Sequence, residues 1–378
     1  MRRWGYYELP GPSAFLDCIE QDIQEEGRSV ILDMGCFAPH GWSEALNERL
    51  GDDWYWKEIN LSGSSPVEAL TQGMQKPKER GVAGVDDIYA FKGFGRQIFI
   101  VKSPDDTTTK VWLNFLLEFA DITRRQPLPS RSVILLLVPP DFRGRMPENV
   151  MIRQYSFEGV VSPVDMLINA NQQISDTQKS VVLRNLRIQL CMELSLWDFE
   201  LCNELSSCSL SELIEPIDRL KRYAEKVGFQ ELVSEGDNDR LIKAGARGQF
   251  EGEERFHSAI LALIDGDPRT INRRVWRAQL RVLYPFVEEC RQNILDQYAS
   301  FIKLPHTRKY GEKVESLQEM EIGDIKVNLD QNLQQHRRLK NFIRNLWKIR
   351  KALAHQDVVP PRNLAERDMD WDYADNHN

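Results

Sequence analysis

The sequence has no long apolar run and no cysteine pair of the kind that binds metal. Its longest apolar run, Val133–Val138, is far shorter than the roughly 18 residues that a membrane-spanning helix needs. The N-terminus carries two arginines but no apolar segment after them, so a secretory signal is not predicted. The six cysteines form no C-x-x-C motif, which predicts reduced thiols and neither a zinc site nor a disulfide framework. We therefore expect a cytoplasmic protein with no membrane partner.

The chain has fewer basic than acidic residues, 49 against 57. The net charge of the 378 residues is −8 at pH 7, which excludes a protein that coats nucleic acid or an anionic membrane over its whole surface. A local basic site is compatible with this balance. The apolar fraction of 42% is enough for a core of ordinary size, and the length exceeds that of a usual single domain. Two domains are therefore expected.

Short apolar runs alternate with helical patterns from Ser29 to Ile168. Strands that are apolar throughout are typical of a parallel sheet with helices on both faces, so we predict an α/β domain over residues 1–168. The predicted strands are residues 29–34, 54–61, 96–103, 132–140 and 151–157, and the predicted helices between them are residues 42–50, 65–74 and 108–125.

The loop after the first predicted strand is where such a fold binds phosphate, because a glycine-rich turn presents backbone N–H groups at the start of a helix. Here the loop is GCFAPHGWS, Gly35–Ser43. It approximates the pattern G-x-x-x-x-G-K-[ST] with one extra residue and with Trp42 in place of the lysine. The third strand ends in Lys102 and Ser103, where a magnesium-binding acid would stand. We therefore predict no ATP hydrolysis, no cofactor and no metal, and we leave open whether the loop holds a nucleotide passively.

This order of elements, with its degenerate phosphate loop, resembles an inactive version of the STAND or AAA-type ATPase module. Such modules occur in multi-gene bacterial defence and signalling systems, and the resemblance covers residues 1–165. It implies a nucleotide-binding-like domain that binds another protein of the same operon, an effector or a sensor. The alternative is an unrelated doubly wound domain whose loop happens to contain two glycines.

A helical period replaces the alternating pattern after Asn169. Apolar residues recur every three or four positions over residues 183–205, 276–294 and 339–353, which predicts amphipathic helices, the second with a kink at Pro285. The polar stretch Ser234–Glu254 is predicted to be a mobile connection. We expect an all-α helical bundle over residues 169–360, followed by an acidic tail at residues 361–378.

Positive charge is concentrated in two of the predicted helices. Residues 269–281 contain five arginines and no acid, and residues 331–355 contain seven lysines or arginines and no acid. Such helices on an acidic protein either form a local anion-binding surface or pair with acidic neighbours, including the tail. The first possibility gives candidate contacts to RNA at six positions: Arg273, Arg274, Arg277, Arg281, Lys348 and Lys351.

The stretch IRKALAHQD, residues 349–357, places an arginine five positions before a histidine near the end of the last predicted helix. It resembles the HEPN ribonucleases, which need no metal, and this resemblance implies a catalytic pair of Arg350 and His355. In such a pair an imidazole acts as acid or base while a guanidinium stabilises the phosphate charge. Lys351 departs from the polar residue usual at its position. Residues five apart on a helix also point about 140° away from each other, so convergence needs a bend or a second chain.

Three functional hypotheses follow from the sequence. The preferred one is a non-catalytic adaptor or regulatory subunit that acts through protein–protein interaction. The second is a HEPN-type endoribonuclease that uses Arg350 and His355, and the third is a nucleic-acid-binding subunit that does not cleave. No further catalytic grouping is predicted, because the histidines outside the loop, the tail and this motif are expected to be isolated: His257, His306 and His336.

Overall fold

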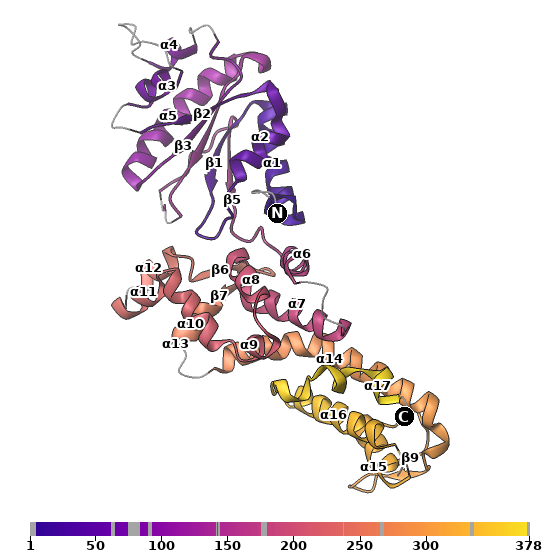
Figure 1. Ribbon diagram of the computed structural model, residues 1–378. Coiled ribbons are helices and arrows are strands. Elements are labelled where there is room, and N and C mark those ends of the chain that lie inside the picture. Colours follow the sequence, from indigo (N-terminus) through magenta and orange to yellow (C-terminus); the bar gives the residue numbers. More distant parts are fainter. Residues whose placement is uncertain are drawn as a thin grey trace. The chain divides into compact units, whose positions relative to one another are not determined.

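The chain divides into two compact units in the computed structural model. Unit 1 contains residues 1–165 and 237–255, and unit 2 contains residues 166–236 and 256–378, so the polypeptide passes between the units three times. Figure 1 labels the elements of each unit. The structure describes residues 5–61, 65–74, 84–89, 93–140, 142, 144–174, 180–236, 238–264, 268–332 and 336–375.

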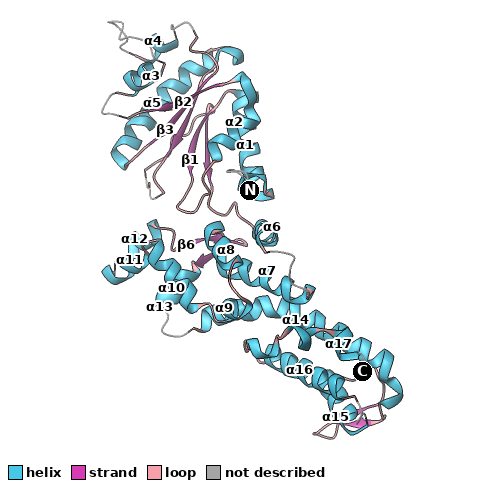
Figure 2. Ribbon diagram, viewed as in Figure 1, coloured by secondary structure: helices cyan, strands magenta, loops and turns pink. Residues whose placement is uncertain are grey.

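A parallel sheet forms the centre of unit 1 (Figure 2). Its order is β2-β3-β4-β1-β5, and each neighbouring pair is parallel. The α/β fold class and all five predicted strands are confirmed. The strands are β1 (Ser29–Asp33), β2 (Tyr55–Ile59), β3 (Gln97–Lys102), β4 (Val133–Leu137) and β5 (Ile152–Ser156).

The central strands are apolar throughout because helices cover both faces of the sheet. Ile31 of β1 lies opposite Leu136 of β4, and Ile100 of β3 lies opposite Leu135. All four side chains are at most 7% exposed. The continuous apolar runs in the sequence therefore report burial on both sides.

The helices of unit 1 include three that the sequence pattern did not predict: α1 (Pro10–Glu26), α4 (Val85–Tyr89) and α12 (Asn238–Lys243). The first begins with Pro10 and Pro12, which are tolerated in an initial turn because the N–H groups there have no partner within the helix. It ends at Gly27, whose φ of 60° suits a residue without a side chain. The other helices are α2 (Trp42–Leu50), α3 (Pro66–Gly73) and α5 (Asp106–Arg125).

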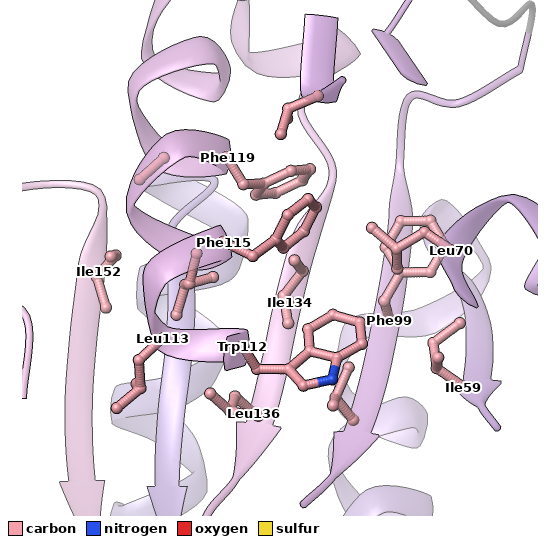
Figure 3. Close-up of a cluster of buried hydrophobic side chains, with 14 of the residues drawn as sticks. Ile59, Leu70, Phe99, Trp112, Leu113, Phe115, Phe119, Ile134, Leu136 and Ile152 are labelled. Carbon is pink, nitrogen blue, oxygen red and sulfur yellow. The ribbon is translucent and has the colours of Figure 1, made fainter. Parts of the chain in front are cut away.

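The largest helix of this unit, α5, packs an aromatic face against the sheet. Figure 3 shows Trp112, Phe115 and Phe119 pointing from α5 towards strand residues such as Ile134 and Phe99. Each of these aromatic side chains is at most 7% exposed. Burial of one large apolar side chain contributes about 1.5–3 kcal/mol, so this face accounts for a large part of the stability of unit 1.

Unit 2 is mainly helical, as the sequence pattern predicted, and its first helix begins in the last residues of unit 1. A short hairpin, β8 (His306–Thr307) and β9 (Lys313–Val314), is added to the bundle. The helices are α6 (Pro163–Gln173), α7 (Val181–Ser195), α8 (Phe199–Ser206), α9 (Leu210–Ile214), α10 (Ile217–Lys226), α11 (Phe229–Glu235), α13 (Ser258–Ile264), α14 (Arg269–Tyr298), α15 (Ile322–Asn332), α16 (Arg337–Ala354) and α17 (Trp371–Asp375).

The predicted helices of this unit need one correction. The stretch 183–205 forms two helices, because the chain reverses at Leu196, where φ is 55°, and Asp198 then caps the start of α8. By contrast, α14 is a single helix of 30 residues that continues through Pro285. None of the helices in the described ranges is both long enough and apolar enough to cross a membrane.

Two stretches that were predicted to be a mobile connection and a tail contain regular elements. The connection, Ser234–Glu254, contains α12 and a hairpin of β6 (Arg247–Phe250) and β7 (Glu253–Phe256). Most of it belongs to unit 1. The predicted tail contains α17 and packs within unit 2, where the rings of Trp371 and Phe342 lie 5.8 Å apart.

Candidate functional site

The loop after β1 is held by groups of the chain itself. Gly35 has a φ of 62°, and its N–H donates to Oδ1 of Asp33 at 3.0 Å. In a phosphate-binding loop that N–H would point at the ligand. Further along the loop, the hydroxyl of Tyr7 donates to the carbonyl of Pro39 at 2.7 Å. The Gly35 N–H and the Pro39 carbonyl of this loop are therefore both hydrogen-bonded within the protein.

The two side chains that frame this loop do not suit phosphate either. Trp42, which stands where the lysine would be, is only 9% exposed and belongs to the core. Asp33 is half-buried, and burial raises the pKa of its carboxyl above the ordinary value. An ionised carboxyl at this place repels phosphate, and a buried indole offers it no charge.

The end of β3 provides no magnesium site. Lys102 Nζ lies 2.6 Å from Oε1 of Glu58 in an exposed ion pair. Asp105 caps α5 by accepting the N–H of Thr108 at 2.7 Å, and this hydrogen bond holds the pKa of the carboxyl below its ordinary value. Over the described ranges, no group of three or more His, Cys, Asp or Glu side chains could hold a metal ion.

Residues 238–255, which we name the covering segment, pack against the loops that follow β1 and β5 at the carboxyl edge of the sheet. Sγ of Cys36 donates to the carbonyl of Lys243 at 2.8 Å. Gly245 has a φ of 82° and packs so closely on Phe37 that a Cβ there would meet the ring at 2.5 Å. At the end of β5, a Cβ on Gly159 would lie 3.3 Å from Cβ of Gln249.

The covering segment has a small core of its own. Three of its side chains are at most 6% exposed although most of the segment is polar: Leu241, Ala246 and Phe250. In an open parallel sheet a ligand binds outside the carboxyl ends of the strands. This segment therefore contacts the loop after β1, beside which a ligand of such a sheet would bind.

The structure does not bring Arg350 and His355 together as a catalytic pair. Arg350 is half-buried, and its guanidinium carbon lies 5.4 Å from the centre of the Tyr284 ring. His355 is exposed at the end of α16, and its ring makes no hydrogen bond or ion pair with any other residue that the structure describes. The helix ends when Gln356 adopts a φ of 60° and Asp357 N donates to Ala352 O at 2.9 Å. A ribonuclease site built on this motif would need a second chain to place an arginine beside His355 or a histidine beside Arg350.

Among the six candidate basic residues, two are engaged inside unit 2. Arg274 is 6% exposed, and its guanidinium donates to the hydroxyl of Ser258 and to the carbonyl of Phe256, the latter at 2.7 Å. Arg281 lies 2.6 Å from Oε1 of Glu193, a carboxylate that is almost fully buried. Both arginines therefore contribute to the fold of unit 2 through these contacts.

The other four candidate basic residues face solvent to different degrees. Arg273, Lys348 and Lys351 are exposed, and Arg277 is half-buried. Within the described part of the chain, none of them has a carboxylate within 4 Å. The structure therefore separates the basic positions of the two helices into structural and available ones.

The sequence pattern missed a buried polar cluster around Asp198 in unit 2. Oδ1 of Asp198 accepts the N–H groups of Glu200 at 2.9 Å and of Leu201 at 3.1 Å. Oδ2 accepts the hydroxyl of Tyr223 at 2.5 Å and Nε2 of His257 at 3.1 Å. Burial, followed by the charge of Asp198, raises the pKa of the Tyr223 hydroxyl. The expectation of an isolated His257 is therefore wrong.

This cluster is structural because it has no access to solvent. His257 is 0% exposed and Asp198 is 1% exposed. Nδ1 of His257 accepts the N–H of Ala259 at 3.2 Å, so the ring carries its proton on Nε2, towards the carboxylate. The other two histidines expected to be isolated also have neighbours: Nε2 of His306 lies 3.7 Å from Asp324, and the His336 ring lies 5.9 Å from that of Tyr298.

A comparison with models of protein families gives no match for this chain, and a comparison with curated proteins gives none either.

Proposed function

We propose that this chain is a non-catalytic adaptor or regulatory subunit that binds another protein of a bacterial defence or signalling system. One observation carries the proposal. The covering segment packs on the loop after β1, where an ATPase of this architecture would hold its nucleotide. A unit that keeps an ATPase-like sheet while packing a segment on this loop retains a folded surface for a partner but loses the chemistry.

The residues at this edge support the same proposal. An ATPase needs an ammonium at the phosphates and an acid at the magnesium ion. Here Trp42 is buried, Lys102 pairs with Glu58, and the carboxylate of Asp105 is committed to capping α5. Three separate changes therefore remove the same activity.

The path of the chain suggests how binding could be passed on. The covering segment lies in unit 1, and the residues that flank it, up to Gly236 and from Phe256 onwards, belong to unit 2. A partner that displaces the segment from the sheet would therefore pull on two chain connections to unit 2. This coupling is what a regulatory subunit requires.

The absence of ATPase activity is tested on the full chain by calorimetric titration with magnesium and ATP and by phosphate release. We expect no heat of binding and no phosphate above the background. The matched variant Trp42→Lys returns an ammonium to the loop and should still release none, because Asp33 and the covering segment remain. Turnover by the natural chain would refute the non-catalytic part of the proposal, and that result does not depend on whether the variant folds.

The adaptor role is tested by co-expression with the proteins encoded beside this chain, followed by gel filtration. We expect one of them to elute with the chain in a fixed ratio and to change its own activity when the chain is added. If each neighbour elutes alone and keeps its activity unchanged, the adaptor role is wrong even where ATP hydrolysis is absent.

A further inference from the structure

The cations of α14 and α16 fall into two groups that differ in their partners. In the first group, Arg281 pairs with Glu193, while Lys340 and Arg344 pair with Asp330 at 3.8 and 2.9 Å. The second group has no carboxylate within 4 Å among the residues that the structure describes, and it consists of Arg273, Arg277, Arg337, Arg338, Lys348, Arg350 and Lys351. The whole chain has a net charge of −8, so the lack of nearby carboxylates around this second group is a local feature of these two helices.

Three cations of the second group, Arg277, Arg350 and Lys351, lie near one contact between α14 and α16. Nε1 of Trp276 donates to the carbonyl of Leu353 at 3.0 Å, which fixes the N-terminal half of α14 against the last turns of α16. The side chain of Gln279 holds Val359 through two hydrogen bonds of 2.7 and 2.8 Å. Arg277 follows Trp276 directly, and Arg350 and Lys351 lie within one turn of Leu353. These three unpaired cations therefore lie in one region of unit 2, whereas Arg337 and Arg338 lie at the start of α16.

Aromatic rings lie among these cations. Arg350 lies over Tyr284, which is 39% exposed. Trp347 is half-buried between two ammonium groups, with Nζ of Lys326 at 4.2 Å and Nζ of Lys351 at 5.6 Å from its ring centre. We name this region the basic–aromatic surface and define it by Arg277, Tyr284, Trp347, Lys348, Arg350 and Lys351.

We propose that the basic–aromatic surface binds single-stranded nucleic acid without cleaving it. Unpaired cations attract a phosphate backbone, and rings beside them give the unpaired bases a place to stack. Double-stranded nucleic acid keeps its bases paired, and neither an acidic peptide nor an anionic bilayer carries bases that could stack on these rings. This binding is a separate function from the adaptor role, and it rests on unit 2 alone.

The size of the effect follows from the number of charges. Each phosphate contact on a single strand contributes about 0.7 to the slope of log affinity against log salt concentration. Loss of Lys348 and Lys351 should therefore lower this slope by about 1.4. Loss of one stacked base weakens binding roughly 5- to 150-fold, which is the expected effect of removing the Tyr284 ring.

The test uses the full chain and fluorescence anisotropy with labelled 20-nucleotide RNA and DNA single strands, in excess chelator and over a range of salt. The double variant Lys348→Ser/Lys351→Ser should weaken binding at least tenfold and reduce the slope. Its matched control, Lys340→Ser/Arg344→Ser, removes the same charge from the same helix but from cations that Asp330 already neutralises. This control should weaken binding less than threefold. The strands should remain intact on a gel.

Several results would overturn the proposal. The first is no binding of single strands at low salt. The second is an equal loss of affinity for single strands in the two double variants. The third is an affinity for heparin or for anionic vesicles equal to the affinity for single strands. Tyr284→Leu adds a readout that charge alone does not move, because it should weaken binding to strands of both kinds and leave heparin unaffected. If RNA binds and DNA does not, the proposal stands and the ligand is narrowed to RNA.

Discussion

Replacement of Asp198 by alanine should destabilise unit 2 more than most single changes, because one carboxylate receives four hydrogen bonds. Two come from the N–H groups of Glu200 and Leu201 at the start of α8. The other two come from Tyr223 and His257, which lie 25 and 59 positions away in the sequence. The change therefore removes a helix cap and leaves two buried donors without an acceptor.

The magnitude can be worked out from these parts. Loss of an N-cap costs about 1 kcal/mol. Each buried donor left unpaired costs about 1–3 kcal/mol, and no water is available to a cluster in which His257 is 0% exposed. Removal of a buried charge offsets part of the sum. We expect a loss of about 3–5 kcal/mol in the free energy of unfolding of unit 2. Asp198→Asn keeps the cap and should cost about 1–3 kcal/mol, because its amide N–H₂ faces two donors.

The assay is hydrogen exchange by mass spectrometry on peptides from α8, which reports the opening of unit 2 even if unit 1 unfolds separately. The control is Glu225→Ala on α10, whose side chain is exposed and which should change the opening free energy by less than about 0.5 kcal/mol. If Asp198→Ala costs less than about 1 kcal/mol, the four hydrogen bonds are not what holds α8, α10 and His257 together, and the reasoning is refuted.

Two further predictions concern unit 1 and the cysteines. The pKa of Asp33 is raised in the folded chain, so the folded chain binds this proton more tightly than the unfolded chain does. Stability should therefore fall as the pH rises from about 4 through the raised pKa. Asp33→Asn should remove this fall and flatten the pH dependence of the melting temperature. A steeper fall in the variant would contradict this. With a thiol reagent at pH 8, two thiols of the native chain should react fast, those of Cys18 and Cys36, while unfolding releases the other four; burial raises the pKa of Cys202 to about 11 and that of Cys290 to about 12. Fast reaction of more than two thiols would show that the buried ones are accessible.

The sequence predicted the sheet well because the information was local. Each strand is a short apolar run, and burial on both faces requires such a run at that place. The degenerate loop was also readable, since Trp42 and Lys102 stand at positions where function fixes the residue type. The first helix was not predicted, although it begins with Pro10 and Pro12, and prolines are favoured in an initial turn.

The rest depended on pairs of residues far apart in the chain. Cys36 and Lys243 are 207 positions apart. The polar sequence of the covering segment contains no pattern that predicts its contact with the loop after β1. Arg277 and Arg281 lie on the same basic helix and look alike in the sequence. In the structure Arg281 pairs with the buried Glu193, whereas Arg277 has no carboxylate within 4 Å among the described residues. Whether a charge is available or engaged is decided by the tertiary structure.

The covering segment also sets an order of events during synthesis. The last strand of the sheet is complete at Ser156, and the segment that covers its carboxyl edge ends at Arg255, 99 residues later. A ribosome adds about 5–20 residues per second, so the edge stays uncovered for roughly 5–20 seconds in each newly made chain. During that interval a nucleotide or a neighbouring protein can reach a surface that the finished molecule closes.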